Sequence, residues 1–485
     1  MLIKGRFITI AASAIGVSAL SQTLGFLRQL LVAAFFGISR DLDIYLVVFA
    51  VASMVVFTFG VIFDSVAVPR LVQLRERDGD EASAALAATV FRLSSLLSIA
   101  ASAVMLAVLP LLAPIVATGF NPVERSELFH LAWYFLPWTL LFVPYYAAAA
   151  RHKGKRNFNR VFTAEIVIGC VSIGFLALWH DTIASLPLAY GAGYALALLS
   201  LLPGSGLIWT ARTRSPRQVL RNIGELFFAN QTGNISSLVD RHFQSLIPAG
   251  GIAAVGYSTQ LINGLSTLLV FREIFVVPLS ETERRAEKLE RLIIGLLLLS
   301  VPVAAFTAGF AHEVIQILYG RGHFDAGAID LTSRVLGISV WSLITSSVGT
   351  PLFRMFQIVD RIGLTHIAYL ASAVFLAGFG YLFVGILDLG APGVAWMLLG
   401  NSILGLGVLA YLVARSGISI GWRRVSGYFA FAVVVSGLAA LAALAAASPF
   451  DAPWERLLAG GVVFAVVVAG VYFVVRARLR HIIYS

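Results

Sequence analysis

A single arginine stands inside an apolar stretch near the start of the chain. In SQTLGFLRQLLVAAFFG (21–37), Arg28 is followed by more than two helical turns of apolar residues, and no acid lies within one turn of it. A buried guanidinium costs free energy unless it meets a partner or water. Its planar fork of N–H groups matches the paired oxygens of a carboxylate or a phosphate. Arg28 is therefore a candidate anion-binding residue, and a structural ion pair with a distant acid is the alternative.

A second candidate group lies in the middle of the chain. Five polar residues follow one another at spacings of four, three, four and three, which places them on one helical face: Asn230, Asn234, Ser237, Arg241 and Gln244. Because this stripe is long and contains a charge, it predicts the lining of a polar cavity. A seam of hydrogen bonds between helices is the alternative. A shorter set, Tyr257, Gln260 and Gly264, fits a seam and a cavity equally well.

Two carboxylates occupy equivalent places before a proline. Asp64 lies five residues before Pro69. Glu273 lies five residues before Pro278, and Arg272 adjoins it. Local ion pairing or snorkelling near the membrane surface is one interpretation of these charges. The functional interpretation is a cytoplasmic gate, or a pair of proton-titrating groups whose carboxyl pKa is raised by burial.

Other chemistries have little support. The eight histidines are scattered without metal-ligand spacing, so we predict no metal site. There is no GxxxxGK[ST] stretch, so we predict no ATPase activity and no bound cofactor. All loops on the predicted outer side are short, which disfavours a membrane enzyme with an external catalytic platform. Candidate driving forces for transport are the membrane potential, protons and sodium ions.

Membrane helices must position these residues. Hydrophobic residues make up 59% of the 485 residues and charged residues 12%, with a mean hydropathy of +0.88, whereas soluble proteins carry about 25% charged residues. Fourteen apolar stretches are long enough to cross a bilayer as helices. The alternating ten-residue segments of a membrane β-barrel are absent. We therefore predict an all-α integral membrane protein with 14 transmembrane helices.

The basic residues are distributed unevenly between the loops. Of the 35 Lys and Arg residues, 26 fall in alternate loops and the termini, whereas five fall in the opposite loops and four within spans. This asymmetry predicts that both termini are cytoplasmic and that the number of spans is even. The net charge of +10 thus reflects the orientation of the loops across the membrane. Its expected partners are anionic lipid headgroups, not nucleic acid.

The chain repeats itself weakly. VAVPRL (66–71) and FVVPLS (275–280) both leave an apolar stretch and enter a charged loop, and a second set of matches pairs Trp138 with Trp341 and Arg151 with Arg354. These matches predict two parallel six-helix lobes, residues 1–215 and 216–420, related by an axis along the membrane normal. The last two spans have no counterpart. They form a predicted C-terminal helix pair, residues 421–485.

Several motifs resemble one family of transporters. LGFLR (24–28), DLDIY (41–45), VDRHFQSL (239–246) and LYGRGHFDAGAIDLTSRVL (318–336) are similar to motifs of MurJ/MviN-type flippases. These belong to the multidrug/oligosaccharidyl-lipid/polysaccharide exporter superfamily, and the resemblance covers roughly residues 10–415. It implies a MATE-like fold in the bacterial inner (cytoplasmic) membrane. The implied function is translocation of an undecaprenyl-diphosphate-linked glycan to the outer leaflet by alternating access. That glycan would be lipid II or an exopolysaccharide or capsule repeat unit.

The resemblance carries roles to only some residues. Arg28 matches an arginine that meets the diphosphate in a central cavity, and Asp43 matches the acid that opens the second helix. Gln22 and Gln29 replace charged residues of the family pattern, and Gln260 stands where an arginine is usual. The expected substrate-binding set is Arg28, Asn230, Asn234, Arg241, Gln244 and Gln260. The expected gating or ion-coupling set is Asp43, Asp64, Arg272 and Glu273.

Two other functions compete with this expectation. An ion-coupled multidrug exporter of the same superfamily would need an acidic or aromatic pocket for cations, whereas the candidate cavity residues are basic or neutral. A non-transporting scaffold for polysaccharide assembly is the second rival. A twelve-helix major facilitator fits less well, because fourteen spans are predicted. Expected partners are the lipid-linked glycan, membrane lipids and proteins of envelope-glycan synthesis.

Overall fold

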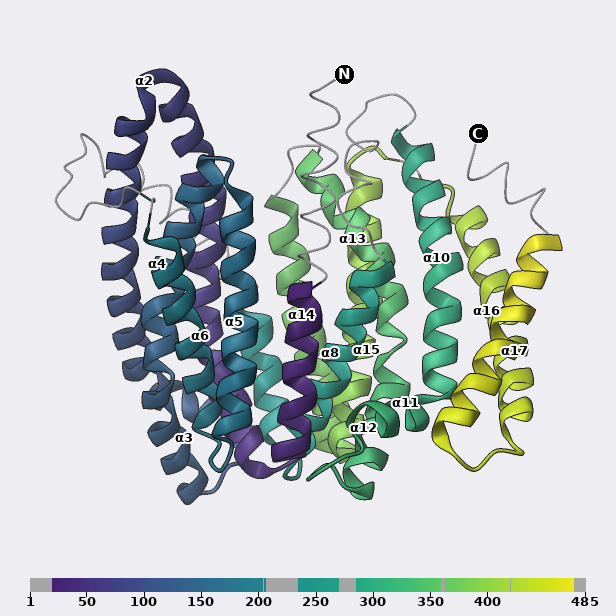
Figure 1. The fold of residues 1–485 in the computed structure, drawn as a ribbon. Coiled ribbons are helices and arrows are strands. Elements are labelled where there is room, and N and C mark those ends of the chain that lie inside the picture. The colour runs from purple at the N-terminus through teal and green to yellow at the C-terminus, as the bar shows by residue number, and fades with distance from the viewer. Residues whose placement is uncertain are drawn as a thin grey trace. The chain divides into compact units, whose positions relative to one another are not determined.

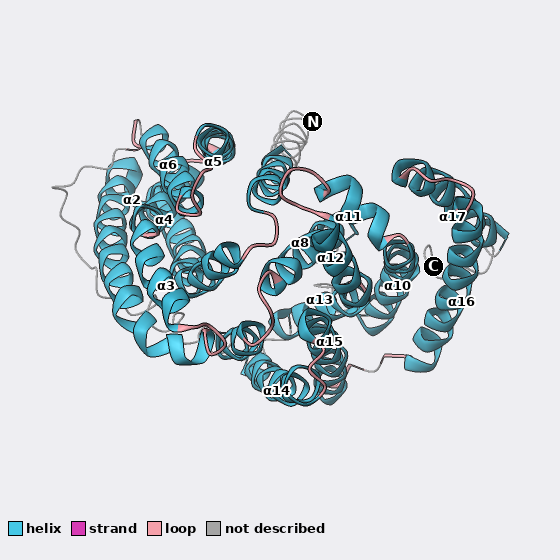
Figure 2. Cartoon of the chain, turned by 90° about the horizontal axis from the view of Figure 1, so that it is seen from below, coloured by secondary structure: helices cyan, strands magenta, loops and turns pink. Residues whose placement is uncertain are grey.

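The computed structural model describes residues 20–203, 205, 234–269, 285–358, 363–418 and 420–474. Every regular element among these residues is a helix, as predicted, and Figure 2 shows helices joined by short loops. The chain divides into two compact units, Met1–Asn234 and Ile235–Ser485. The predicted three-part division at 215/216 and 420/421 stays a prediction, since its first boundary falls outside the described residues.

The first unit contains six described helices: Leu20–Phe36, α2 (Arg40–Val116), α3 (Pro122–Tyr134), α4 (Leu136–Gly154), α5 (Phe158–Leu178) and α6 (Ser185–Leu201). The long helix α2 corresponds to the second and third predicted spans, roughly residues 43–69 and 84–119, and folds back on itself (Figure 1). Gly79 allows this reversal, because its backbone has φ 89° and ψ 178°, a conformation that side-chain-bearing residues avoid. Across the turn, the Ser83 hydroxyl donates to the Leu71 carbonyl at 3.0 Å.

Eleven elements of the second unit follow. They are residues 234–245, α8 (Gly251–Leu269), α10 (Arg285–Gly309), α11 (Ala311–Tyr319), α12 (Ala326–Ser339), α13 (Ser342–Ile358), α14 (Gly363–Gly380), the π-helix η1 (Tyr381–Ile386), α15 (Gly390–Arg415), α16 (Trp422–Ala447) and α17 (Pro453–Val474). Helices α16 and α17 pack on each other and on the end of α10. Phe310 and Phe464 meet three alanines of α16 there, so small residues let these helices approach closely.

Two predicted spans are bent in the same way. Helices α3 and α4 meet at an angle of 42°, and so do α12 and α13. Pro137 stands in the first turn of α4, where its missing N–H needs no partner. The two bends lie beside Trp138 and Trp341, which the weak repeat pairs with each other. The bends therefore recur at matching places of the two predicted lobes.

The length and hydropathy of the helices fit a multi-pass membrane protein. Within the described ranges, eight helices are long and apolar enough to cross a membrane, or ten if each bent pair is one span. Leu20–Phe36 and Ser185–Leu201 are shorter apolar helices. The predicted total of fourteen spans is consistent with this set, and it stays a prediction because several spans extend outside the described residues.

Close packing of α14 on the helix at residues 234–245 gives a first testable prediction. A Cβ atom added at Gly380 would overlap with the buried Phe243 ring. We expect Gly380→Ala to lower the free energy of unfolding by about 1–3 kcal/mol, because the ring has to move out of its packed position. Thermal unfolding of the detergent-purified protein measures this. Gly378→Ala is the matched control on the same helix, since no atom lies within 4 Å of its Cβ position; equal losses in both variants would contradict the packing argument.

Candidate functional site

The structure gives Arg28 an aromatic neighbour. Arg28 lies on the helix Leu20–Phe36, and its side chain is half-buried. The guanidinium carbon lies 3.9 Å from the centre of the Tyr190 ring of α6. Within the described ranges no carboxylate forms an ion pair with Arg28. The alternative of a structural pair with a distant acid therefore finds no support in this part of the chain, and a cation–π contact stands in its place.

Tyr190 belongs to an aromatic cluster inside the first unit. Its ring centre lies 6.0 Å from that of Phe49 and 5.8 Å from that of Trp138. Phe49 stacks on Trp138 at 5.3 Å and on Tyr45 at 5.9 Å. Trp138 is only 1% exposed. Arg28 thus lies at the edge of a packed aromatic wall, which no local sequence pattern indicated, because its members come from three separate helices.

Asp43, one of the predicted gating residues, is fully buried in an ionic cluster. One guanidinium nitrogen of Arg40 lies 3.8 Å from the Asp43 carboxylate. The same guanidinium donates two hydrogen bonds to Glu124, at 2.9 and 3.0 Å, and so ties α2 to the start of α3. Its carbon also lies 4.1 Å from the Phe120 ring centre. Sequence reasoning missed Arg40 and Glu124; the only available signal was the capping box of Asn121 and Glu124 at the start of α3.

Some residues of the polar stripe around Arg241 form hydrogen bonds with neighbours on the same helix. Arg241 donates to the Gln244 side-chain oxygen at 2.7 Å, and Gln244 donates to the Asp240 carboxylate at 2.8 Å. Gln244 is buried, Asn234 is half-buried and Ser237 is exposed. Asn230 lies outside the described residues. The predicted one-sided stripe is therefore a helix face with an internal hydrogen-bond chain, and Asp240 is a member that the spacing argument missed.

The remaining predicted site residues are dispersed. Gln260 is half-buried on α8, whereas Tyr257 on the same helix is buried with its ring centre 5.0 Å from that of Tyr319. Tyr257 is thus part of a packing seam. Arg272 and Glu273 lie outside the described residues. Asp64 lies within α2, and its side chain also falls outside the description. The gating set as a whole stays a prediction.

The RGHFD turn (321–325), part of the motif match at residues 318–336, has a structural explanation. Arg321 donates to the carbonyl oxygens of Ile317 and Leu318, both at 3.0 Å, and thereby caps the end of α11. Asp325 caps α12 by accepting from the Ala328 N–H at 2.8 Å. The buried Phe324 ring lies between these caps and packs on Tyr257 and Tyr319. The motif therefore joins two helices and anchors the turn to α8.

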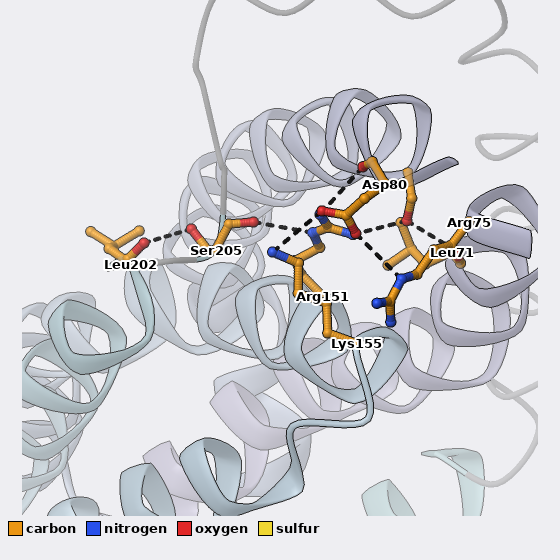
Figure 3. A network of polar contacts seen from close by, with 8 residues as sticks. Leu71, Arg75, Asp80, Arg151, Lys155, Leu202 and Ser205 are labelled. Carbon is orange, nitrogen blue, oxygen red and sulfur yellow. Dashed lines mark hydrogen bonds and ion pairs between the residues drawn. The ribbon is translucent and has the colours of Figure 1, made fainter. Parts of the chain in front are cut away.

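A polar cluster around the buried Arg151 lies at the charged tip of the α2 hairpin (Figure 3). Arg151, fully buried near the end of α4, donates to Ser83, to the Ser205 carbonyl oxygen and to the Asp80 carboxylate, at 2.9, 3.1 and 3.1 Å. Burial acts to raise the pKa of Asp80, but Arg151, Lys155 and Arg75 outweigh it and hold this carboxyl pKa below its usual value. Arg151 entered the sequence analysis only as a repeat match of Arg354; the structure shows it joining α2, α4 and the chain after α6.

This cluster yields a stability prediction. We expect Arg151→Gln to lower the free energy of unfolding by roughly 2–3 kcal/mol. The variant loses the hydrogen bonds that the charged guanidinium donates to the buried Ser83 and Ser205. Arg75→Gln serves as the control, since Arg75 is partly exposed and contacts Asp80 at 3.4 Å. An exposed pair contributes about 0–1 kcal/mol. Urea or thermal unfolding in detergent measures both variants, and a neutral Arg151→Gln would contradict the structural role.

Two cavities lie away from the predicted site residues. One, of about 390 Å³, lies in the first unit and includes Asp41, Glu127 and Asp181 in its lining. The other, of about 710 Å³, lies in the second unit and is lined by residues that include Arg334 and Trp396. None of the predicted substrate-binding or gating residues lines either cavity. In the described ranges no group of three or more His, Cys, Asp or Glu residues could hold a metal ion.

Comparison with known protein families identifies the group to which the chain belongs. A family model described as lipid II flippase MurJ matches residues 32–459, most of the sequence. The chain belongs to the MurJ family. The predicted resemblance to this family is thereby confirmed, and the RGHFD motif lies within the matched residues. The family is one of lipid transporters.

Curated relatives cover most of this MurJ-family chain. A probable lipid II flippase MurJ of Aquifex aeolicus is 23% identical over 458 residues, which are 89% of this chain and 88% of the relative. A lipid II flippase MurJ of Burkholderia cenocepacia is 22% identical over 403 residues, 76% of this chain and 78% of the relative.

Solved structures confirm the predicted fold. A lipid II flippase MurJ in an inward closed conformation matches with a TM-score of 0.79 at 18% identity, covering 96% of this chain and 99% of that one. An inward-facing multidrug resistance MATE family transporter matches with a TM-score of 0.60 at 16% identity, covering 84% and 95%. The all-helical MurJ/MATE architecture is thus shown for this multi-pass membrane protein.

Proposed function

We propose that this protein flips an undecaprenyl-diphosphate-linked glycan from the cytoplasmic to the outer leaflet of the bacterial inner membrane, with both termini in the cytoplasm. The protein acts by alternating access of two parallel lobes. Arg28 meets the diphosphate, and the polar residues of the seventh and eighth predicted spans, roughly residues 223–247 and 251–278, bind the glycan. These residues are Asn230, Asn234, Arg241, Gln244 and Gln260.

The arrangement around Arg28 is the observation that supports this proposal. A half-buried guanidinium with an aromatic ring as its neighbour, and no ion pair in the described part of the chain, keeps N–H donors available for oxygen atoms. A diphosphate supplies closely spaced anionic oxygens that suit this fork. A cationic drug would be repelled by the same group, so a multidrug exporter of this superfamily fits the residue less well.

Lipid II is the substrate that family membership favours. Both curated relatives carry the name lipid II flippase. Gln22, Gln29 and Gln260 replace charged residues of the family pattern, which keeps an exopolysaccharide or capsule repeat unit as the second candidate glycan. The two candidates share the polyprenyl diphosphate and differ in the sugar, so the mass of the bound lipid distinguishes them.

Mass spectrometry of lipids that co-purify with the protein in mild detergent tests the proposal. We expect a polyprenyl-diphosphate glycan with the wild type and its depletion in Arg28→Ala. Arg92→Ala is the matched control, because Arg92 is also half-buried within an apolar stretch but donates to Thr89 at 3.2 Å. Bulk phospholipid alone, unchanged by Arg28→Ala, would overturn the diphosphate role and favour a drug exporter or a scaffold.

A further inference from the structure

We propose that Tyr190 positions Arg28 for its anion. This inference rests on the proposed function and adds a residue that does not itself contact the lipid. The face of an aromatic ring attracts a cation, and Tyr190 does so at 3.9 Å. Unlike a carboxylate, a ring face neither neutralises the guanidinium nor accepts strong hydrogen bonds from its edge. Arg28 is thus held in place while its N–H groups keep their capacity to bind oxygen.

The backbone that carries Tyr190 is held closely on two sides. A Cβ atom added at Gly191 would lie 2.7 Å from Cβ of Pro137 on α4. One added at Gly193 would lie 3.0 Å from the Ile168 carbonyl oxygen on α5. Such contacts need glycine, because only a residue without a side chain permits this approach between helices. The sequence YGAG (190–193) therefore packs α6 between α4 and α5 and leaves the Tyr190 backbone little room to move.

The helix that carries Arg28 is held in a comparable way. A Cβ atom added at Gly169 of α5 would lie 2.9 Å from Cβ of Leu24, one turn before Arg28. Two turns after Arg28, the Phe35 ring stacks on His180 with 4.0 Å between centres. The cation–π contact therefore connects two backbones that packing already places. A site that is organised before binding spends less free energy on ordering itself when the ligand arrives.

The ring, not the hydroxyl, carries this role. Tyr190→Phe keeps an aromatic face, so binding of the diphosphate is expected to stay within about threefold of wild type. Tyr190→Leu removes the π face while filling similar space. We expect it to weaken binding about tenfold, since the Arg28 side chain then has to be ordered by the ligand.

A double-mutant cycle tests the inference. The probe is undecaprenyl diphosphate, titrated into the detergent-purified full chain and followed by native mass spectrometry. We expect Tyr190→Leu to weaken binding in the wild-type background and to have no further effect in Arg28→Ala, because the two residues act as one unit. Phe142→Leu is the control: the Phe142 ring of α4 belongs to the same aromatic cluster, 5.7 Å from the Trp138 ring centre, whereas the ring that Arg28 contacts is that of Tyr190. This variant is therefore expected to report lost packing alone, without lost binding.

The outcomes separate the inference from the proposed function. If Arg28→Ala weakens binding and Tyr190→Leu does not, Tyr190 has no positioning role and the proposed function stands. If Tyr190→Leu weakens binding equally in both backgrounds, Tyr190 acts without Arg28 and the inference is wrong. Unchanged binding in Arg28→Ala would overturn the proposed function itself. A weakened Tyr190→Phe would move the role from the ring to the hydroxyl and also contradict the inference.

Discussion

Arg28→Ala is expected to slow flipping of a lipid-linked diphosphate by at least about 100-fold, because two charge-assisted hydrogen bonds to phosphate oxygens are each worth roughly 1.5–3 kcal/mol. The flipping rate of Arg28→Lys is expected to lie between those of Arg28→Ala and the wild type, about tenfold below wild type, since lysine keeps the charge but not the bidentate fork. The measurement is the initial rate at which a fluorescent lipid-linked diphosphate crosses the bilayer of proteoliposomes that contain the purified protein.

Two controls make this rate informative. Arg92→Gln removes another arginine from an apolar stretch, one already bonded to Thr89, and is expected to leave the rate within about twofold of wild type. A neutral fluorescent phospholipid, flipped by no variant above background, shows that transport depends on the diphosphate. Equal rates for Arg28→Lys and wild type would mean that charge alone matters, and a normal rate for Arg28→Ala would exclude the diphosphate role.

Arg40→Gln is expected to lower the free energy of unfolding by about 3–5 kcal/mol. Asp43 is fully buried, and Glu124 is bound to the same guanidinium through two hydrogen bonds. Removing Arg40 takes away the guanidinium that pairs with both carboxylates, one of which is fully buried, and this costs far more than losing a surface pair. The midpoint of thermal or denaturant unfolding in detergent measures the loss.

Arg125→Gln is the matched control for Arg40→Gln. Arg125 lies near the same helix junction and donates to the Ala117 and Thr118 carbonyl oxygens, partly in solvent. Its loss is expected to cost about 1 kcal/mol or less. A stability of Arg40→Gln equal to that of Arg125→Gln would contradict the buried cluster. The predicted gating role of Asp43 adds a second readout, because Arg40→Gln should then also change the flipping rate in molecules that remain folded.

Properties that depend only on neighbouring residues along the chain were predictable from the sequence. Bilayer thickness sets the length of an apolar helix, so hydropathy alone predicted an all-helical membrane protein, and family comparison confirmed the class. Local motifs carried the family resemblance because they act over a few neighbouring residues: RGHFD caps one helix and starts the next. Arg28 was noticed because a charge in an apolar stretch contrasts with its own neighbours.

Only the tertiary structure decided which residues meet. Tyr190 is far from Arg28 along the chain, as Glu124 is from Arg40 and Ser205 from Arg151, and no spacing rule relates them. A cation in a helix can be satisfied by a carboxylate, a carbonyl or a ring, and the sequence contains all three. The choice depends on how closely glycines let helices approach and on where a bend such as that beside Trp138 directs the chain. These are properties of the packed helices. The periodicity of the sequence therefore predicts the helix face on which a side chain lies, but not the residue that it contacts.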